Sequence, residues 1–253
     1  MTSQYSQYEI TGKVHSFYKK FIHIYFFKFF IKNFIYALRK VFRLIDYLRI
    51  KKNSKLFKLI KENYFDNYNI PYEDIYFNYN LVLKKKPNLI LELGCGYSTI
   101  TFASALSKLN HGKLISLEQN DFWLKKTFNI CNKIDYFSKS KSEIILSDAV
   151  WKKFEDLQLS FYEKLPECNP DIILVDGPNH KSVEGKNFMN LDFPVSGDVL
   201  NLENKLKIGT IIIFDGRVKN LNLIEKKLKR KYKKTINYLD SRNILELIES
   251  KLI

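Results

Sequence analysis

The sequence predicts an α/β fold, in which a mostly parallel, twisted sheet has helices on both faces and a helical extension precedes it. From about residue 88 onward, short apolar runs alternate with polar helical stretches, as in parallel sheets joined by helices. Residues 14–65 are aromatic and basic, contain no Pro or Gly, and are expected to be helical. Pro71 follows them. We therefore divide the chain into a helical arm, 1–70, and a folded domain, 71–253.

The predicted strands follow one another as short apolar segments. The first five, expected to be parallel, span residues 88–92, 113–117, 143–146, 171–175 and 210–214. A helix from about Thr99 to Leu109 follows the first of them. Two later segments, 234–239 and 243–248, are expected to close the sheet as a pair.

Acidic residues stand at the end of the second to fifth predicted strands: Glu118, Asp148, Asp176 and Asp215. In the first strand, Glu92 lies just before a glycine turn. Ligands of open α/β sheets bind at the carboxyl edge, where these side chains would gather. A single acid there could be a turn or N-cap residue, but the repetition indicates a binding site.

The glycine turn has the sequence Leu-Glu-Leu-Gly-Cys-Gly-Tyr-Ser-Thr, residues 91–99. Gly94 and Gly96 let the backbone turn sharply and approach a ligand. A dinucleotide-binding loop would carry a third glycine where Thr99 stands, which disfavours the alternative of a nicotinamide cofactor. The segment instead resembles motif I of the class I S-adenosylmethionine-dependent methyltransferases, in which an acid, two spaced glycines and a Ser or Thr follow one another.

This resemblance implies a Rossmann-like class I methyltransferase fold with S-adenosylmethionine as cofactor. The loop of Gly94, Gly96 and Ser98 would border the methionine part of the cofactor, and Glu92 would help to hold its amino group. Glu118 stands at a strand end, where a carboxylate can accept both ribose hydroxyls. Asp148 matches the position that contacts the adenine amino group in this family.

The reacting end of the site is predicted at Asp176 and Asp215, which end neighbouring strands. In the cation-dependent O-methyltransferases, acids at these places bind Mg²⁺ or another divalent cation, which would activate a substrate hydroxyl. In that family an Asn ligand usually follows the second acid, whereas here Gly216 does. The metal-free interpretation uses Asp176 with His180, a candidate general base in the same loop.

The methyl acceptor is predicted from a looser resemblance. The segments 175–178, 194–198 and 209–217 resemble bacterial O-methyltransferases that accompany glycan or polysaccharide biosynthesis, which implies O-methylation of a sugar or another small hydroxyl compound. The Asn/Asp-Pro-Pro-Tyr/Phe motif of amino-group methylation is absent, since Asp176-Gly-Pro-Asn stands there. Two alternatives stay open: an RNA or small-molecule N-methyltransferase, and a non-catalytic scaffold with a degenerate cofactor site.

The charge and the cysteines give weaker indications. The net charge of +15 favours a polyanionic partner, although A/T-rich codons alone would also enrich the chain in lysine. No base-reading motif accompanies the charge, so a nucleic-acid partner is not predicted. The three cysteines form no CxxC pair and no zinc-ligand spacing, which favours a reducing, cytoplasmic location.

The arm has two chemically different faces. Lys28, Lys32, Arg39, Arg43 and Asp46 share one helical stripe, and Phe30, Phe34, Leu38, Val41, Ile45 and Leu48 lie opposite. Such a helix suits peripheral contact of residues 17–50 with the inner face of an anionic membrane. Alternatively, its apolar face packs on the catalytic domain or on a second subunit of a homo-oligomer. A spanning helix is not expected, because lysines interrupt the apolar run.

Overall fold

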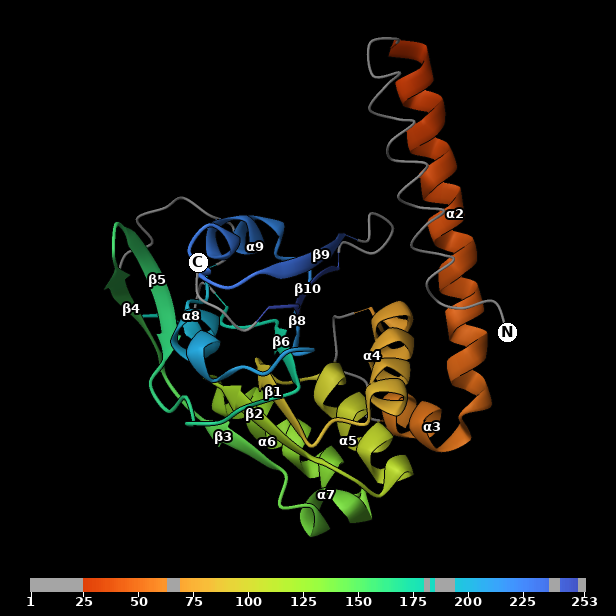
Figure 1. The fold of residues 1–253 in the computed structure, drawn as a ribbon. Coiled ribbons are helices and arrows are strands. Elements are labelled where there is room, and N and C mark those ends of the chain that lie inside the picture. Colours follow the sequence, from red (N-terminus) through yellow and green to blue (C-terminus); the bar gives the residue numbers. More distant parts are fainter. Residues whose placement is uncertain (1–24, 63–68, 180–182, 185–193, 237–241, 250–253) are drawn as a thin grey trace.

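A seven-stranded sheet forms the centre of the computed structural model, which describes residues 25–62, 69–179, 183–184, 194–236 and 242–249 (Figure 1). Its strand order is β3-β2-β1-β6-β8-β10-β9. The first five strands in that order are parallel, and β10 is antiparallel to both its neighbours. The strands are β1 (Leu89–Leu93), β2 (Lys113–Glu118), β3 (Glu143–Leu146), β6 (Ile172–Val175), β8 (Ile211–Phe214), β9 (Tyr232–Ile236) and β10 (Asn243–Leu247).

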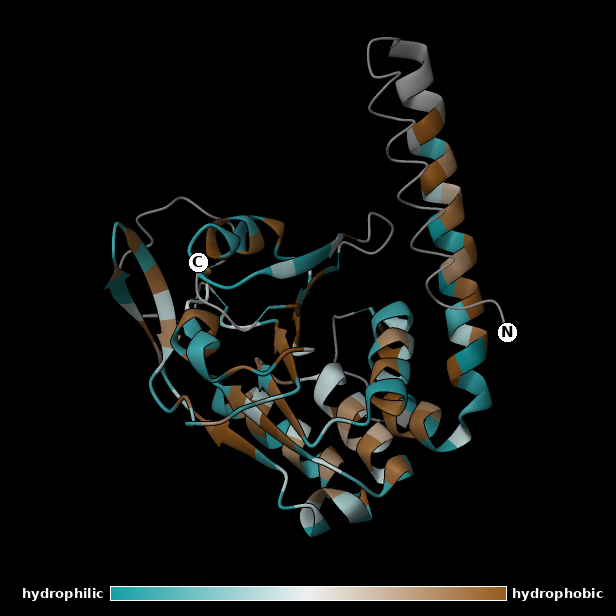
Figure 2. Cartoon of the chain, in the orientation of Figure 1, coloured by the Kyte–Doolittle hydropathy of each residue, from teal (hydrophilic) through white to brown (hydrophobic). Residues whose placement is uncertain are grey.

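The α/β fold predicted from the sequence is confirmed, and the first five strands lie within one residue of their expected bounds. β6 and β8 are buried along their whole length, because helices cover both faces of the sheet. Alternate residues of β6 lie on opposite faces of the sheet. Ile172 and Leu174 belong to one apolar core, and Ile173 and Val175 belong to the other. Figure 2 shows the apolar residues concentrated in these central strands.

Helices pack on both faces of the sheet. α5 (Tyr97–Leu109) and α6 (Asp121–Cys131) contribute to one apolar core, while α8 (Asp198–Leu202) and α9 (Val218–Glu225) contribute to the other. The short helix α7 (Asp135–Lys139) contacts α5. α5 begins directly after the glycine turn, so the turn brings the N-terminal end of this helix to the carboxyl edge of the sheet.

A second, three-stranded sheet was not predicted from the sequence. β4 (Ala149–Phe154) and β5 (Leu157–Tyr162) form an antiparallel hairpin, and β7 (Val183–Glu184) pairs with β4. β4 contains Lys152 and Lys153, both exposed, which break the alternating apolar pattern that would indicate a strand. The turn of the hairpin uses Glu155 at a φ of 53°, an uncommon conformation for a residue with a side chain.

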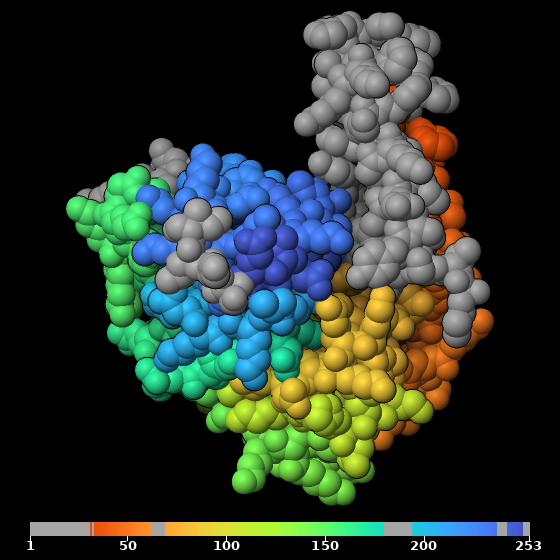
Figure 3. All heavy atoms as spheres, in the orientation of Figure 1, coloured from red at the N-terminus to blue at the C-terminus, as the bar shows by residue number. Residues whose placement is uncertain are grey.

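Three helices precede the sheet: α2 (Tyr25–Lys52), α3 (Ser54–Glu62) and α4 (Tyr72–Lys85). α2 runs along one flank and extends past the rest of the described chain (Figures 1 and 3). Asn53 follows its last residue, and the Asn53 side-chain oxygen accepts a hydrogen bond from the Leu56 amide and so caps α3. The predicted helicity is confirmed for α2 and α3, while residues 14–24 and 63–65 lie outside the described ranges.

One face of α2 packs on α4 and α3. The Arg43 guanidinium lies 2.7 Å from the Glu73 carboxylate of α4, and Ile50 is buried in the core. Rings of Tyr47, Phe57 and Tyr72 meet at centroid distances of 5.0 to 6.3 Å. The basic stripe predicted from the sequence therefore faces the domain at Arg43. The opposite, apolar face is the exposed one at Phe34, Val41 and Leu48, with exposed fractions of 47 to 53%.

Candidate functional site

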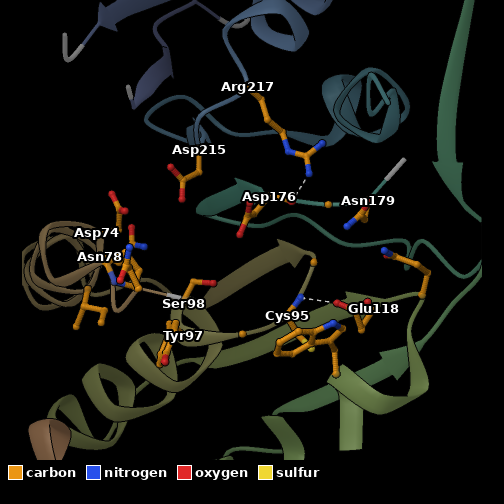
Figure 4. Close-up of a pocket in the computed structure, with 18 residues that line it drawn as sticks. Asp74, Asn78, Cys95, Tyr97, Ser98, Glu118, Asp176, Asn179, Asp215 and Arg217 are labelled. Atoms are coloured by element: carbon orange, nitrogen blue, oxygen red, sulfur yellow. Dashed lines mark hydrogen bonds between the residues drawn. The ribbon is translucent and has the colours of Figure 1, made fainter. Parts of the chain in front are cut away.

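A pocket opens at the carboxyl edge of the sheet (Figure 4). One wall consists of the glycine turn after β1 and the end of β2. The opposite wall comes from the loops after β6 and β8, and the N-terminal half of α4 borders the pocket from a third side. The strand ends thus meet where ligands of open α/β sheets bind.

The position of Gly94 requires a glycine because the turn after β1 closely approaches the loop after β6. Its φ of +96° disfavours any residue with a side chain, and a Cβ atom there would lie 2.9 Å from the Gly177 backbone nitrogen. The Leu93 carbonyl accepts hydrogen bonds from the amides of Asp176 and Gly177. The glycine turn and the loop after β6 are therefore locked together, which fixes Asp176 relative to the turn.

Gly96 leaves the pocket open above α5. A Cβ atom there would meet nothing within 4 Å, so the space beside the first turn of this helix is free for a ligand. The helix N-terminus carries a partial positive charge and suits a carboxylate group. Ser98, in the same first turn, also lines the pocket.

Glu92 lies beneath the glycine turn, fully buried, and does not line the pocket. The hydroxyls of Thr99 and Ser116 donate hydrogen bonds of 2.7 and 2.5 Å to its carboxylate, and the Gly96 amide donates to the Thr99 hydroxyl. Burial raises the pKa of Glu92 to about 7. In this structure Glu92 supports the shape of the turn from beneath, and its part in holding the cofactor's amino group stays a prediction.

Glu118 ends β2 and faces the pocket. Its carboxylate accepts hydrogen bonds from the backbone amides of Cys95, at 2.9 Å, and Asn120, at 2.8 Å. These bonds fix the carboxylate beside the glycine turn, and each oxygen keeps a lone pair for a further donor. Burial raises the pKa of Glu118, and the backbone bonds oppose that rise. This position suits recognition of a vicinal diol.

Asp148 is exposed and does not line the pocket, although the resemblance had given it a contact with adenine. It follows β3 and leads directly into the hairpin, where its carbonyl accepts a hydrogen bond from the Glu163 amide. The hairpin, unforeseen in the sequence, turns the chain away from the pocket at this residue.

Trp123 and Gln119 are pocket residues that sequence reasoning missed. Trp123 lies in the first turn of α6, where its amide donates to the Asn120 side chain. An aromatic ring just after the acid that ends β2 is well situated to stack on a planar base. The sequence could have indicated Trp123, because this aromatic residue follows the strand-end acid Glu118 by only five positions.

Asp176 and Asp215 both line the pocket, on the loops after β6 and β8. Figure 4 shows their carboxylates on the same side of the cavity. Asp176 is exposed in the open pocket. Partial desolvation by the surrounding protein, and secondarily the charge of Asp215, raises the pKa of Asp176 above its ordinary value.

Arg217 fixes the loop that carries Asp176. Its guanidinium donates hydrogen bonds to the backbone carbonyls of Asp176, Pro178 and Pro194, and only 7% of the residue is exposed. Burial lowers the pKa of this guanidinium, while Asp176 opposes that shift. The Arg217 guanidinium is therefore engaged with backbone carbonyls.

The described residues offer two carboxylates for a metal ion, Asp176 and Asp215. Among these residues no group of three or more His, Cys, Asp or Glu side chains is arranged to hold one. Gly216 contributes no side chain, and the Arg217 guanidinium already lies beside Asp176. Two carboxylates could therefore hold Mg²⁺ only if water or acceptor oxygens supplied its remaining ligands. His180, the other candidate of this loop, lies outside the described residues.

Polar groups of α4 face the pocket at the same end as Asp215 (Figure 4). Asn78 is 3% exposed, and its side-chain oxygen has no hydrogen-bond donor within the described part of the chain. Asp74 lies one turn earlier, 3.2 Å from the Arg242 guanidinium. A buried amide oxygen without a donor is unfavourable unless a ligand or water supplies one.

The fold resembles solved methyltransferase structures. An S-adenosylhomocysteine-bound methyltransferase of Podospora anserina has a TM-score of 0.51 and 14% identity, over 77% of this chain and 88% of its own. A Staphylococcus aureus protein named as a caffeoyl-CoA O-methyltransferase has a TM-score of 0.52 and 15% identity, over 84% of this chain and all of its own. No protein-family model and no curated protein matches the sequence. The structural likeness shows a class I methyltransferase fold.

Proposed function

We propose that the protein is an S-adenosylmethionine-dependent O-methyltransferase acting on a small, neutral, hydroxyl-rich acceptor such as a sugar. The observation that carries this proposal is that one pocket joins two kinds of group. The glycine turn and Glu118 lie on one side, and the carboxylates of Asp176 and Asp215 lie on the other. Such a pocket can hold a nucleoside-containing methyl donor and an acceptor hydroxyl next to each other.

The residues of the first wall fit S-adenosylmethionine. The open space above Gly96 and the α5 N-terminus suit its amino-acid part, the Glu118 carboxylate suits its ribose, and the Trp123 ring suits its adenine. When bound, S-adenosylmethionine supplies a methyl group on a sulfonium centre that an oxygen nucleophile can attack. Holding both reactants in line is expected to provide much of the rate enhancement.

Asp176 is the residue we assign to the acceptor hydroxyl. A C–O bond forms as the C–S bond breaks, and the hydroxyl proton must leave the acceptor oxygen. The raised pKa of Asp176 brings its carboxylate closer to the basicity that proton removal near neutral pH requires. Asp215 lies beside it and can orient the same hydroxyl, while Arg217 holds the Asp176 backbone in place. No step of this scheme uses a metal.

The acceptor class follows from the charges of the second wall. Asp176 and Asp215 line it, Asp74 of α4 borders the pocket beside it, and the guanidinium of Arg217 is engaged with backbone carbonyls. Within the described lining no Lys or Arg other than Arg217 is offered to a phosphate or carboxylate, while Asp74 is paired with Arg242 and the raised pKa of Asp176 reduces its charge. Carboxylate and amide oxygens accept hydrogen bonds from hydroxyl groups, and the Asn78 oxygen lacks a donor within the described residues. We therefore favour a polyhydroxyl acceptor over a nucleic acid or another acceptor that carries phosphate or carboxylate groups.

Transfer of a labelled methyl group tests the proposal. Purified protein is incubated with methyl-labelled S-adenosylmethionine and a panel of neutral sugars, sugar phosphates and amines. Label is expected in an ether of a neutral sugar, and Asp176→Asn is expected to lower turnover by about 10²-fold. Asp148→Asn, an exposed acid outside the pocket, is the matched control and should be unchanged.

Two further measurements on the same reaction separate the mechanisms. Activity should survive dialysis against EDTA, and His180→Ala should reduce it only a few-fold, because Asp176 takes the proton. Loss on chelation that Mg²⁺ reverses would assign the carboxylates to a metal. A His180→Ala defect as large as that of Asp176→Asn would assign the base to His180. Label found only in amines would contradict O-methylation.

A further inference from the structure

The exposed side of α2 carries a continuous apolar strip. Phe34, Ala37, Val41, Leu44 and Leu48 are all exposed, and they follow one another at intervals of three and four residues, which keeps them on one face. The four larger side chains are 47 to 58% exposed. Arg43 and Ile50, which contact the domain, lie about half a turn away around the helix. The strip therefore points away from the body of the protein.

The helix that carries this strip is strongly basic. α2 contains eight Lys or Arg residues and one acid, Asp46, which gives it a net charge of +7. Asp46 is engaged with the Arg49 guanidinium at 3.1 Å. Lys40 and Lys51 are exposed along one edge of the strip and lie over the rings of Tyr36 and Tyr47. Apolar side chains edged by lysines and tyrosine match the layered chemistry of a membrane interface.

We propose that α2 binds the surface of an anionic lipid bilayer, with the strip in the acyl boundary and the flanking lysines at the headgroups. The net positive charge of α2 favours an anionic lipid surface as its partner. A second copy of the chain could also cover a strip with this spacing, but it would bring two helices of charge +7 together without acidic partners. No described helix is apolar enough over sufficient length to cross a membrane, so the contact is peripheral.

Co-sedimentation with lipid vesicles tests this proposal on the full-length chain. The probes are vesicles of phosphatidylcholine alone and vesicles in which about one-third of the lipid is phosphatidylglycerol. Binding is expected only to the anionic vesicles. It should weaken strongly when ionic strength rises from about 0.1 M to about 1 M, because the screening length falls from about 10 Å to about 3 Å.

Two sets of variants locate the contact. The Val41→Glu/Leu44→Glu double variant should reduce affinity for anionic vesicles by at least about tenfold, since it places charges within the strip. Phe122→Glu/Ile208→Glu, which alters exposed apolar residues elsewhere, should bind like wild type. Lys40→Ala and Lys51→Ala should each weaken binding about fivefold, whereas Lys233→Ala on β9 should not.

Sedimentation velocity without lipid, and unfolding curves for each variant, complete the test. The strip is exposed, so Val41→Glu/Leu44→Glu should fold as wild type does and keep its oligomeric state. The proposal is overturned if the wild-type chain ignores anionic vesicles, or if the strip variants and their controls bind equally. It is also overturned if the strip holds a dimer that Val41→Glu/Leu44→Glu dissociates while lipid binding is absent.

Discussion

Glu118 offers the sharpest residue-level test of the cofactor site, because Asp148 provides a matched acid. Glu118→Ala is expected to weaken S-adenosylhomocysteine binding by about 1.5–3 kcal/mol, the range for hydrogen bonds to a charged group. Asp148→Ala should leave affinity unchanged, since Asp148 is exposed outside the pocket. Calorimetric titration of both variants measures the difference. If both variants lost the same affinity for S-adenosylhomocysteine, Asp148 would belong to the cofactor site, and the described position of the hairpin would be wrong.

Glu92 should make stability depend on pH. Its folded-state pKa of about 7 lies above the value of 4.5 for an unperturbed Glu, so the folded chain holds this proton more tightly. The stabilisation is complete below about pH 4.5 and is lost as pH rises through 7.

In Glu92→Gln this titration is absent. The stability of the variant relative to wild type should therefore increase by about 2–3 kcal/mol between pH 5 and 8. Urea unfolding curves at several pH values measure this change. A difference between the two proteins that is independent of pH would show that Glu92 is ionised in the folded state throughout, contrary to its fully buried position.

The sequence predicted six of the residues that line the pocket, but not all of their contacts. Gly94, Gly96, Ser98, Glu118, Asp176 and Asp215 line one cavity because parallel strands bring their carboxyl ends to one edge. Glu92 and Asp148 share the same pattern and lie elsewhere, since burial and the direction of the following chain decide which way a side chain points. Asn78 on α4 could not be found this way, because helix–loop packing over long sequence distances has no local signature.

At the scale of elements, the glycine turn and the loop after β6 act as one unit. Gly94→Ala is expected to destabilise the fold by about 2–4 kcal/mol, combining the strain of a positive φ with a backbone clash. Gly209→Ala is the matched control, because Gly209 has a φ of +86° and open space around it. It should cost only about 1–2 kcal/mol.

Chemical unfolding of both glycine variants, with S-adenosylhomocysteine titrations, checks this expectation. Gly94→Ala should also weaken ligand binding, since the turn must shift to relieve the clash with Gly177. If both variants lose the same stability and bind the ligand as wild type does, the two loops are not locked together as described.

Elements with a strong local pattern were predicted well. The buried strands β6 and β8 are continuous apolar runs, and the antiparallel pair β9 and β10 was expected from its two apolar segments. The β4–β5 hairpin was missed because two consecutive lysines, Lys152 and Lys153, break the apolar alternation of its first strand. For α2 the helix was predicted, but periodicity alone could not say which face would meet α4. The ion pair of Arg43 with Glu73 shows that the polar face does.

At the scale of the whole molecule, α4 connects the proposed methyl-transfer pocket with the proposed lipid-binding helix α2. This helix packs against α2 on one side and borders the acceptor part of the pocket on the other. The apolar strip lies on the side of α2 that faces away from α4, so a bilayer bound by the strip and the pocket would lie on opposite sides of α2. The two proposals can be tested independently, because vesicle binding is measured without methyl transfer.

Calorimetric titration of the wild-type protein with S-adenosylhomocysteine, beside an identical titration with NAD, tests the central claim most directly. The pocket built from Gly94, Gly96, Glu118 and Trp123 predicts one site per chain with micromolar affinity, about −8 kcal/mol, and no comparable binding of NAD. Tight binding of NAD together with no heat from S-adenosylhomocysteine would contradict the assignment of the cofactor and of the methyl-transfer function that rests on it.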